Sequence, residues 1–104
     1  MTDKRVVLTT AGSEDEARRI AAALVERKLA ACVNIVPKIL SIYRWKGKVE
    51  EAEEWMLVIK TAAGFERVRD AIEELHSYEV PECICLSIED GGPEYLKWLE
   101  DSVE

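Results

Sequence analysis

A set of polar and aromatic side chains interrupts segments that are otherwise apolar, and these side chains could together bind a ligand. They are Asn34, Trp45, Lys60, Tyr78 and Glu82. Four of them bear hydrogen-bonding or charged groups, and the indole ring of Trp45 offers a flat surface for stacking. Mostly apolar walls with a few convergent polar groups are typical of a small-ligand pocket. We therefore predict that these residues line a cleft for an anion or another small ligand.

The same residue types also fit a purely structural interpretation. Lys60 and Glu54 could form an ion pair between subunits, and Asn34 could cap an irregularity in a strand. Residue types alone do not separate a binding pocket from a polar interface of this kind. Both interpretations are therefore retained at this point.

Motifs that mark catalytic sites are missing from the sequence. It has no nucleophile elbow, no glycine-rich phosphate loop, no HExxH motif and no recognisable Ser-His-Asp set. His76 could serve as a general base, but no neighbouring motif indicates a substrate. A small hydrolase of the acylphosphatase kind would need an arginine on a phosphate-binding loop, and Asn34 lies in the middle of a strand. We predict that the protein is not an enzyme and keep such a hydrolase as the less favoured alternative.

Cys32, Cys83 and Cys85 occur without the CxxC spacing of zinc or redox motifs. Cys83 and Cys85 are two residues apart and so share one face of a strand. Free cysteine is among the most buried residue types. We predict that the cysteines are buried small apolar residues, with ligation of a soft metal as the alternative.

Length and composition restrict the class of protein. The 104 residues suit a single domain, which we place at 1-104. The net charge of −7 argues against a nucleic-acid-binding protein, which needs a basic surface. No apolar run approaches the roughly 20 residues that cross a bilayer, and no signal-peptide pattern begins the chain, so we expect a cytoplasmic location without membrane association. Glutamine is absent while Glu, Lys and Arg are abundant, which is typical of thermophilic proteins.

Hydrophobic periodicity and turn residues predict the elements that must position these side chains. Alternating and β-branched runs indicate strands, and Ser13 with Glu16 is the capping-box signature of a helix start. The predicted elements are strand 4–10, helix 14–28, strand 31–45, strand 49–61, a helix from Phe65 that ends at His76 and Ser77, strand 82–89, and a helix from Pro93. The order β-α-β-β-α-β-α indicates an α+β, ferredoxin-like split βαβ fold, in which an antiparallel sheet carries helices on one face.

The two central strands form a long hairpin that is apolar on both faces. On its first strand a bulge is expected at Pro37. The residues predicted to share one face are Val33, Ile35, Ile39, Tyr43 and Trp45, and those predicted on the other face are Cys32, Val36, Leu40 and Ile42. The helices cover only one face of the sheet, so a monomer would leave the other face exposed. We therefore predict an obligate homo-oligomer of cyclic symmetry whose hairpins contact neighbouring subunits.

Several linked motifs resemble those of the CutA family of divalent-cation tolerance proteins. They are the stretches 29–37 (LAACVNIVP), 41–49 (SIYRWKGKV), 76–82 (HSYEVPE) and 95–99 (YLKWL), with Glu54, Lys60 and Thr61 between them. Several motifs in the same order are far more specific than any one of them. The resemblance implies a ferredoxin-like protomer, a homotrimer similar in architecture to PII-type signalling trimers, and a role in tolerance of divalent metal ions, copper especially. It further implies binding of a metal or small ligand at clefts between subunits.

The resemblance also makes His76 the candidate metal ligand. In relatives with a proposed copper site, a cysteine near the end of the first strand and a His-His pair are implicated, and the matching positions here are Thr9 and Leu75-His76. Transition-metal sites normally use three or four N or S ligands, so His76 would need others, such as Glu79 or Glu82 of converging subunits. We retain His76 as a candidate ligand of a divalent metal, copper first. The alternatives are a helix-end histidine without a metal and a trimeric scaffold or signalling module with no physiological metal site.

Overall fold

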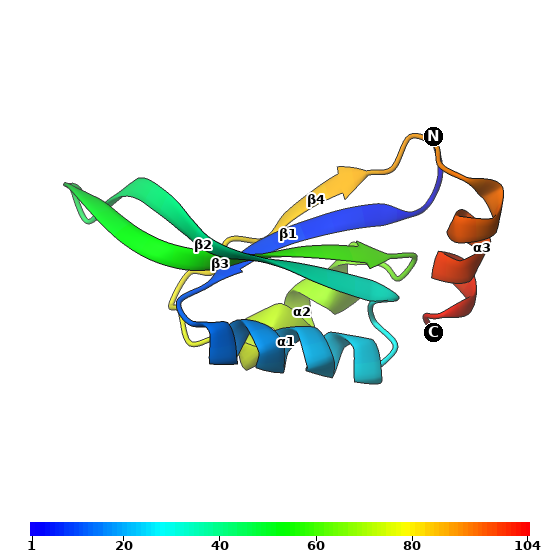
Figure 1. Cartoon of the computed structure of the whole chain (residues 1–104), viewed down its shortest axis with the longest axis horizontal. Helices are drawn as coiled ribbons and strands as arrows, with labels where there is room; N and C mark the ends of the chain where they lie inside the picture. The colour runs from blue at the N-terminus through cyan, green and yellow to red at the C-terminus, as the bar shows by residue number, and fades with distance from the viewer.

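The elements of the chain follow the predicted order. The computed structural model describes residues 1–104, and its elements are β1 (Arg5–Ala11), α1 (Glu14–Glu26), β2 (Cys32–Trp45), β3 (Lys48–Thr61), α2 (Phe65–Leu75), β4 (Ile84–Ser87) and α3 (Pro93–Asp101). The strands form one antiparallel sheet in the order β2-β3-β1-β4, and α1 and α2 lie on one face of it (Figure 1). The α+β, ferredoxin-like fold predicted from the sequence is thereby confirmed.

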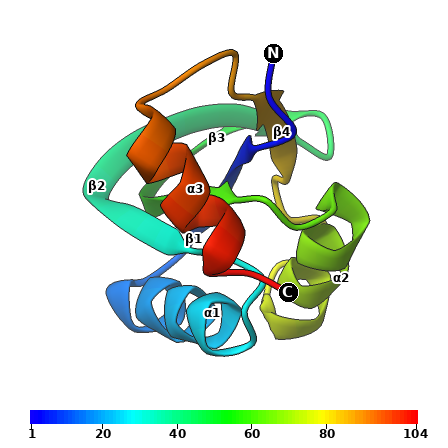
Figure 2. The ribbon, with the colours of Figure 1, turned by 90° about the vertical axis from the view of Figure 1, so that its right-hand side faces the viewer.

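The core fills the layer between the sheet and the helices α1 and α2. Alternate residues of β1 and β3 face this layer, and one side of each helix packs against them. Its fully buried members are Val7, Ala11, Ala17, Ile20, Leu24, Leu57, Ile59, Val68 and Ile72. The helix α3 lies across the end of the sheet at which β3 finishes, as Figure 2 shows from that side, and it buries Leu99.

A β-bulge in β2 turns the side chains of the outer half of this strand to the opposite face of the hairpin. The pairing with β3 shifts by one residue between positions 36 and 39, at the predicted site around Pro37, and Lys38 takes a φ of 55° there. One inserted residue turns every later side chain to the opposite face. The predicted grouping of hairpin residues is therefore wrong beyond the bulge. The predicted grouping placed Ile39, Tyr43 and Trp45 on the same face as Val33 and Ile35, but they lie on the other face.

Local hydrogen bonds determine both ends of α1. Oγ of Ser13 accepts from the backbone N–H of Glu16 at 3.1 Å, and acidic residues fill the first turn. At the other end the N–H of Leu29 donates to the carbonyl oxygen of Leu24 at 3.0 Å, as in a Schellman motif. Lys28 takes a φ of 58°, the left-handed conformation that stops a helix. The helix therefore ends at Glu26, two residues before the end that the sequence predicted.

The strand β4 is shorter than the predicted strand 82–89. It pairs with β1 only over Ile84–Ser87. In the same register a longer ladder would place Glu82 opposite Thr10. The carbonyl oxygen of Thr10 is instead bound by the ring of His76 at 2.6 Å, which removes that acceptor from the ladder. Residues 76–83 thus run as an irregular segment past the end of β1.

The second face of the sheet and the tip of the hairpin are covered by neither α1 nor α2 (Figure 1). Large apolar side chains there are 42% to 67% exposed. They are Val36, Ile84 and Leu86 on the second face of the sheet, and Leu40, Ile42 and Val49 near the tip. Single exposed apolar residues are ordinary, but several large ones on one small domain indicate an association surface.

Candidate functional site

A cleft of about 600 Å³ lies between the outer half of the hairpin, the end of β1 and the segment that follows α2. Its lining residues are Thr10, Ser41, Ile42, Tyr43, Trp45, Glu54, Tyr78, Glu79, Val80 and Glu82. The bulge in β2 turns Tyr43 and Trp45 to the face on which Thr10 and Glu54 also lie. Aromatic walls with a few polar groups are the composition expected of a small-ligand site.

The charged groups of the cleft are all acidic. Glu54, Glu79 and Glu82 line it, and no lysine, arginine or histidine does. An anion would meet only like charges here, whereas a cation would be attracted. The lining therefore favours a cationic ligand over the anion considered from the sequence.

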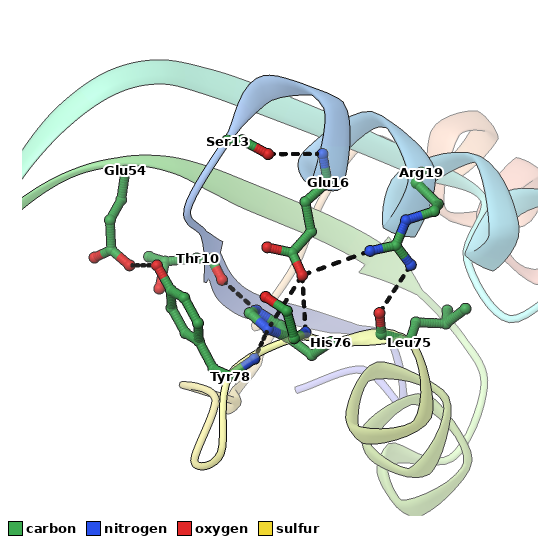
Figure 3. Close-up of polar contacts among 9 residues, drawn as sticks. Thr10, Ser13, Glu16, Arg19, Glu54, Leu75, His76 and Tyr78 are labelled. Atoms are coloured by element: carbon green, nitrogen blue, oxygen red, sulfur yellow. Dashed lines mark hydrogen bonds and ion pairs between the residues drawn. The ribbon is translucent and has the colours of Figure 1, made fainter.

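A hydrogen bond between Tyr78 and Glu54 joins two walls of the cleft (Figure 3). The phenol oxygen of Tyr78 donates to Oε2 of Glu54 at 2.7 Å. Glu54 is only 7% exposed, and a buried carboxylate needs such a donor. Burial raises the pKa of Tyr78, and the hydrogen bond to the Glu54 carboxylate raises it further. The phenol therefore remains a protonated donor at neutral pH.

Glu82 holds its proton more strongly than an ordinary glutamate. Burial raises its pKa, and the negative charge of Glu54 raises it further. Both side chains line the same cleft. A cation bound between them would offset this repulsion and release the proton that Glu82 holds at lower pH.

A buried carboxylate of α1, that of Glu16, anchors the segment that follows α2 (Figure 3). Its Oε2 accepts from the N–H of Ser77 at 2.8 Å and lies 3.5 Å from Nη2 of Arg19 and 3.7 Å from Nδ1 of His76. Burial alone would raise the pKa of Glu16, but the hydrogen bonds that its carboxylate accepts from Ser77 outweigh burial and lower it. Arg19 also donates to the carbonyl oxygen of Leu75 at 2.9 Å, which ties α1 to the end of α2.

The side chain of His76 is fully buried, and both nitrogens of its ring have partners. Nε2 lies 2.6 Å from the carbonyl oxygen of Thr10, and Nδ1 accepts from the backbone N–H of Tyr78 at 3.0 Å. A carbonyl oxygen only accepts and a backbone N–H only donates, so the proton belongs on Nε2 and not on Nδ1. These partners assign the neutral Nε2–H tautomer to the ring. A metal ion would have to break one of these two bonds to reach a nitrogen of His76.

The structure divides the predicted ligand residues between two places. Trp45, Tyr78 and Glu82 line the cleft. Asn34 and Lys60 lie at the opposite end of the hairpin, where Nζ of Lys60 donates to Oδ1 of Asn34. The five residues therefore do not form one site within a protomer.

Several residues of the cleft were not recognised as such from the sequence. They are Thr10, Ser41, Tyr43, Glu54 and Glu79. Without the one-residue shift of register, Tyr43 and Glu54 would face opposite sides of the hairpin. The signal that could have brought Tyr43 and Glu54 together is Pro37. A strand proline cannot donate to the ladder, so it favours the bulge that shifts the register.

Potential metal ligands are scattered over the chain. No group of three or more His, Cys, Asp or Glu side chains is arranged to hold a metal ion. Cys32, Cys83 and Cys85 are free and half-buried, and burial raises the pKa of the Cys83 thiol. Thr9, at the position of the cysteine implicated in relatives, is fully buried under the helices. The role of His76 as a metal ligand stays a prediction.

Comparison with known proteins decides the family. The family model described as CutA1 divalent ion tolerance protein matches residues 5–102. The chain belongs to the CutA family. The divalent-cation tolerance protein CutA of Thermus thermophilus is 50% identical over 100 residues, which cover 95% of this chain and 97% of that protein. The CutA homolog of Xenopus laevis is 50% identical over 95 residues, and the chain spans 63% of its length.

Solved CutA structures share the whole fold. That of the Thermus thermophilus protein superposes with a TM-score of 0.92 at 49% identity, over 97% of this chain and 99% of that one. That of Archaeoglobus fulgidus superposes with a TM-score of 0.93 at 44% identity, over the same shares. The resemblance recognised in the sequence is thus confirmed. The family is named for tolerance of divalent ions and not for a reaction.

The compartment of the protein stays a prediction. No helix of the chain has the length and apolar character of a membrane span. The Archaeoglobus fulgidus relative is named as a periplasmic divalent cation tolerance protein. The cytoplasmic location expected from the sequence is therefore neither confirmed nor contradicted, and the same holds for the predicted thermophilic origin.

Proposed function

We propose that this CutA protein acts in tolerance of divalent cations by binding a cation, or a small cationic ligand, in the acidic cleft of a homotrimer. The observation that carries the proposal is the cleft itself. Glu54, Glu79, Glu82 and the phenol of Tyr78 line it, and no basic side chain does. Because no three acidic side chains of one protomer are arranged to hold an ion, a neighbouring subunit would complete the set of ligands. Carboxylate oxygens are ligands for divalent cations, and their charge raises the local concentration of such ions.

The donor atoms of the cleft favour some ions over others. Carboxylate and phenol oxygens suit hard cations such as Mn²⁺ and Mg²⁺, whereas copper prefers imidazole or sulfur ligands. Copper, the ion that the resemblance implies, would therefore draw on donors in addition to these oxygens. His76 is the only histidine of the chain, and the centroid of its ring lies 4.6 Å from that of the Tyr78 ring. Mn²⁺ and Cu²⁺ are accordingly the two ions to compare.

Exposed apolar surface supports the trimer. The uncovered face of the sheet and the hairpin tip present side chains such as Leu40, Ile42 and Val49, which are 62% to 67% exposed. Burying such a surface against copies of the chain stabilises a cyclic oligomer, and membership of the CutA family favours three copies. Because Ile42 also lines the cleft, a neighbouring subunit packed on the hairpin would lie beside the binding site.

Titration calorimetry with Mn²⁺ and Cu²⁺ tests the proposal. We expect Glu54→Gln and Glu82→Gln each to weaken binding by about tenfold or more, which corresponds to about 1.4 kcal/mol. The matched control is Glu53→Gln, because Glu53 is the exposed neighbour of Glu54 on the opposite face of β3. Binding to Glu54→Gln as tight as to the wild type would exclude the cleft, and absence of binding by the wild type would overturn the proposal. Equal copper binding by the wild type and His76→Ala would exclude His76 as a ligand.

Proton competition gives a second test of the same site. Because the pKa of Glu82 is raised, the cleft takes up a proton as pH falls, and this proton competes with a cation. Affinity for Mn²⁺ is therefore expected to fall as pH drops through the raised pKa of Glu82. In Glu82→Gln this dependence should flatten, whereas an unchanged pH dependence would show that Glu82 does not take part.

A further inference from the structure

The irregular segment that carries Tyr78 is held by few hydrogen bonds. Residues 76–83 belong to no helix or strand, so no ladder fixes them. The backbone hydrogen bonds that hold it at Tyr78 are the bond from the N–H of Ser77 to Glu16 and the bond from the N–H of Tyr78 to the side chain of His76. The phenol of Tyr78 then reaches Glu54. The position of the cleft hydroxyl thus depends on two buried side chains outside the cleft lining.

The ring of His76 bridges the segment to the sheet. It donates from Nε2 to the carbonyl oxygen of Thr10 and accepts at Nδ1 from Tyr78, so it fixes the distance between β1 and the segment (Figure 3). The rings of His76 and Tyr78 also pack at a centroid distance of 4.6 Å. Gly12 permits this arrangement, because a Cβ at that position would lie 3.0 Å from the phenol oxygen of Tyr78.

We propose that Glu16 and His76 are positioning residues of the cleft, which hold Tyr78 so that its hydroxyl donates to Glu54. The inference rests on the proposed binding function of the cleft. It adds that Glu16 and His76 together determine where the hydroxyl of Tyr78 lies in the cleft. It also gives the lone histidine a role other than metal ligation. Neither side chain touches the ligand, and each acts through Tyr78.

Two conservative substitutions separate positioning from ligation. The side-chain amide of asparagine places its oxygen near the site of Nδ1, so His76→Asn can still accept from the N–H of Tyr78 and loses the bond to Thr10. The longer glutamine places its amide near the site of Nε2, so His76→Gln keeps the bond to Thr10 and loses the acceptor for Tyr78. Neither amide replaces imidazole as a transition-metal ligand. A ligand role therefore predicts equal loss in both variants, and a positioning role predicts a difference.

The binding readout is the affinity of the cleft for Mn²⁺. We expect His76→Asn to stay within about threefold of the wild type, because the acceptor it keeps acts directly on Tyr78, and His76→Gln and Glu16→Ala to lose about tenfold, the effect of one hydrogen bond to the segment. Glu14→Gln is the control, because Glu14 is an exposed glutamate in the first turn of the same helix. Equal affinities of His76→Asn and His76→Gln would overturn the proposal.

A spectroscopic readout needs no ligand and so distinguishes failure of this inference from failure of the proposed function. His76 is the only histidine, so its imidazole ¹⁵N resonances need no assignment among several rings. We expect a protonated Nε2 and an unprotonated Nδ1 in the wild type. The ¹³Cζ resonance of Tyr78, assigned with Tyr78→Phe, should shift in Glu16→Ala, stay in place in Glu14→Gln, and shift more in His76→Gln than in His76→Asn, since both of the latter lose the ring that packs on Tyr78. A protonated Nδ1, or a Tyr78 resonance that is unchanged in Glu16→Ala and equal in His76→Gln and His76→Asn, would overturn the inference even if Mn²⁺ binds.

Discussion

Two buried threonines provide a matched test of how hydroxyl groups contribute to this fold. Thr9 in β1 and Thr61 in β3 are both fully buried. Oγ1 of Thr9 has no hydrogen-bond partner, whereas that of Thr61 donates to the carbonyl oxygen of Leu29 at 2.6 Å and accepts from the N–H of Ala63 at 2.9 Å. Valine has the shape of threonine with a methyl group in place of the hydroxyl. The same substitution is therefore expected to change stability in opposite directions at the two sites.

The expected magnitudes follow from the hydrogen bonds of each hydroxyl. Burying a hydroxyl without a partner costs about 1 to 3 kcal/mol in proteins, and valine avoids that cost. We expect Thr9→Val to raise the free energy of unfolding by about 1 to 2 kcal/mol. Thr61→Val loses two hydrogen bonds and leaves the buried polar groups of Leu29 and Ala63 unpaired, at about 1 to 2 kcal/mol each. We expect it to lower the free energy of unfolding by about 2 to 4 kcal/mol.

Chemical denaturation followed by circular dichroism measures both effects. The variants and the wild type are compared at one protein concentration, because the stability of an oligomer depends on concentration. A change of midpoint with an unchanged m-value reports stability and not a change in the unfolded state. If Thr9→Val destabilises the protein as much as Thr61→Val does, the hydroxyl of Thr9 has a partner and the reasoning fails.

Three further substitutions test separate parts of the structure. The pKa of Glu16 is lowered on folding, so its carboxylate stabilises the fold above the unfolded value and this contribution is lost as pH falls through the lowered pKa. The amide oxygen of glutamine still accepts from Ser77 but without the charge, so Glu16→Gln should lower the free energy of unfolding by about 1 kcal/mol at neutral pH and reduce its acid dependence in urea denaturation. An equal loss at all pH values would contradict this. Lys28 has a φ of 58°, so Lys28→Gly should stabilise α1 by about 0.5 to 1 kcal/mol in the same assay, and a loss of stability would argue against the left-handed cap. Ile42 is 62% exposed near the hairpin tip, so Ile42→Glu should reduce the mass in sedimentation velocity to the 11.8 kDa of the protomer, and an intact oligomer would place the tip outside the interface.

Local patterns were sufficient to predict the elements of the fold. The alternation of residues 31–45 and the capping box at Ser13 are properties of short segments, and short segments decide whether a strand or helix forms. The ends of elements depended on more distant contacts. β4 stops short because His76 binds the carbonyl oxygen of Thr10, and nothing in the sequence around Glu82 indicates that competition.

The candidate site was predicted only in part. Trp45, Tyr78 and Glu82 line the cleft, although Trp45 reaches it only because the bulge turns it to the face of Glu54. Asn34 and Lys60 do not, because the length of the hairpin separates its two ends. The burial of His76 depends on packing between α1, β1 and the segment after α2, and such packing cannot be inferred from a helix-end position alone.

The central claim is that the acidic cleft binds a divalent cation, and anomalous diffraction from crystals soaked in Mn²⁺ tests it most directly. We predict an anomalous peak within ligand distance of the carboxylates of Glu54 and Glu82, with Tyr78 still hydrogen-bonded to Glu54 through its hydroxyl. A peak elsewhere on the protein, with the cleft empty at saturating Mn²⁺, would contradict the account.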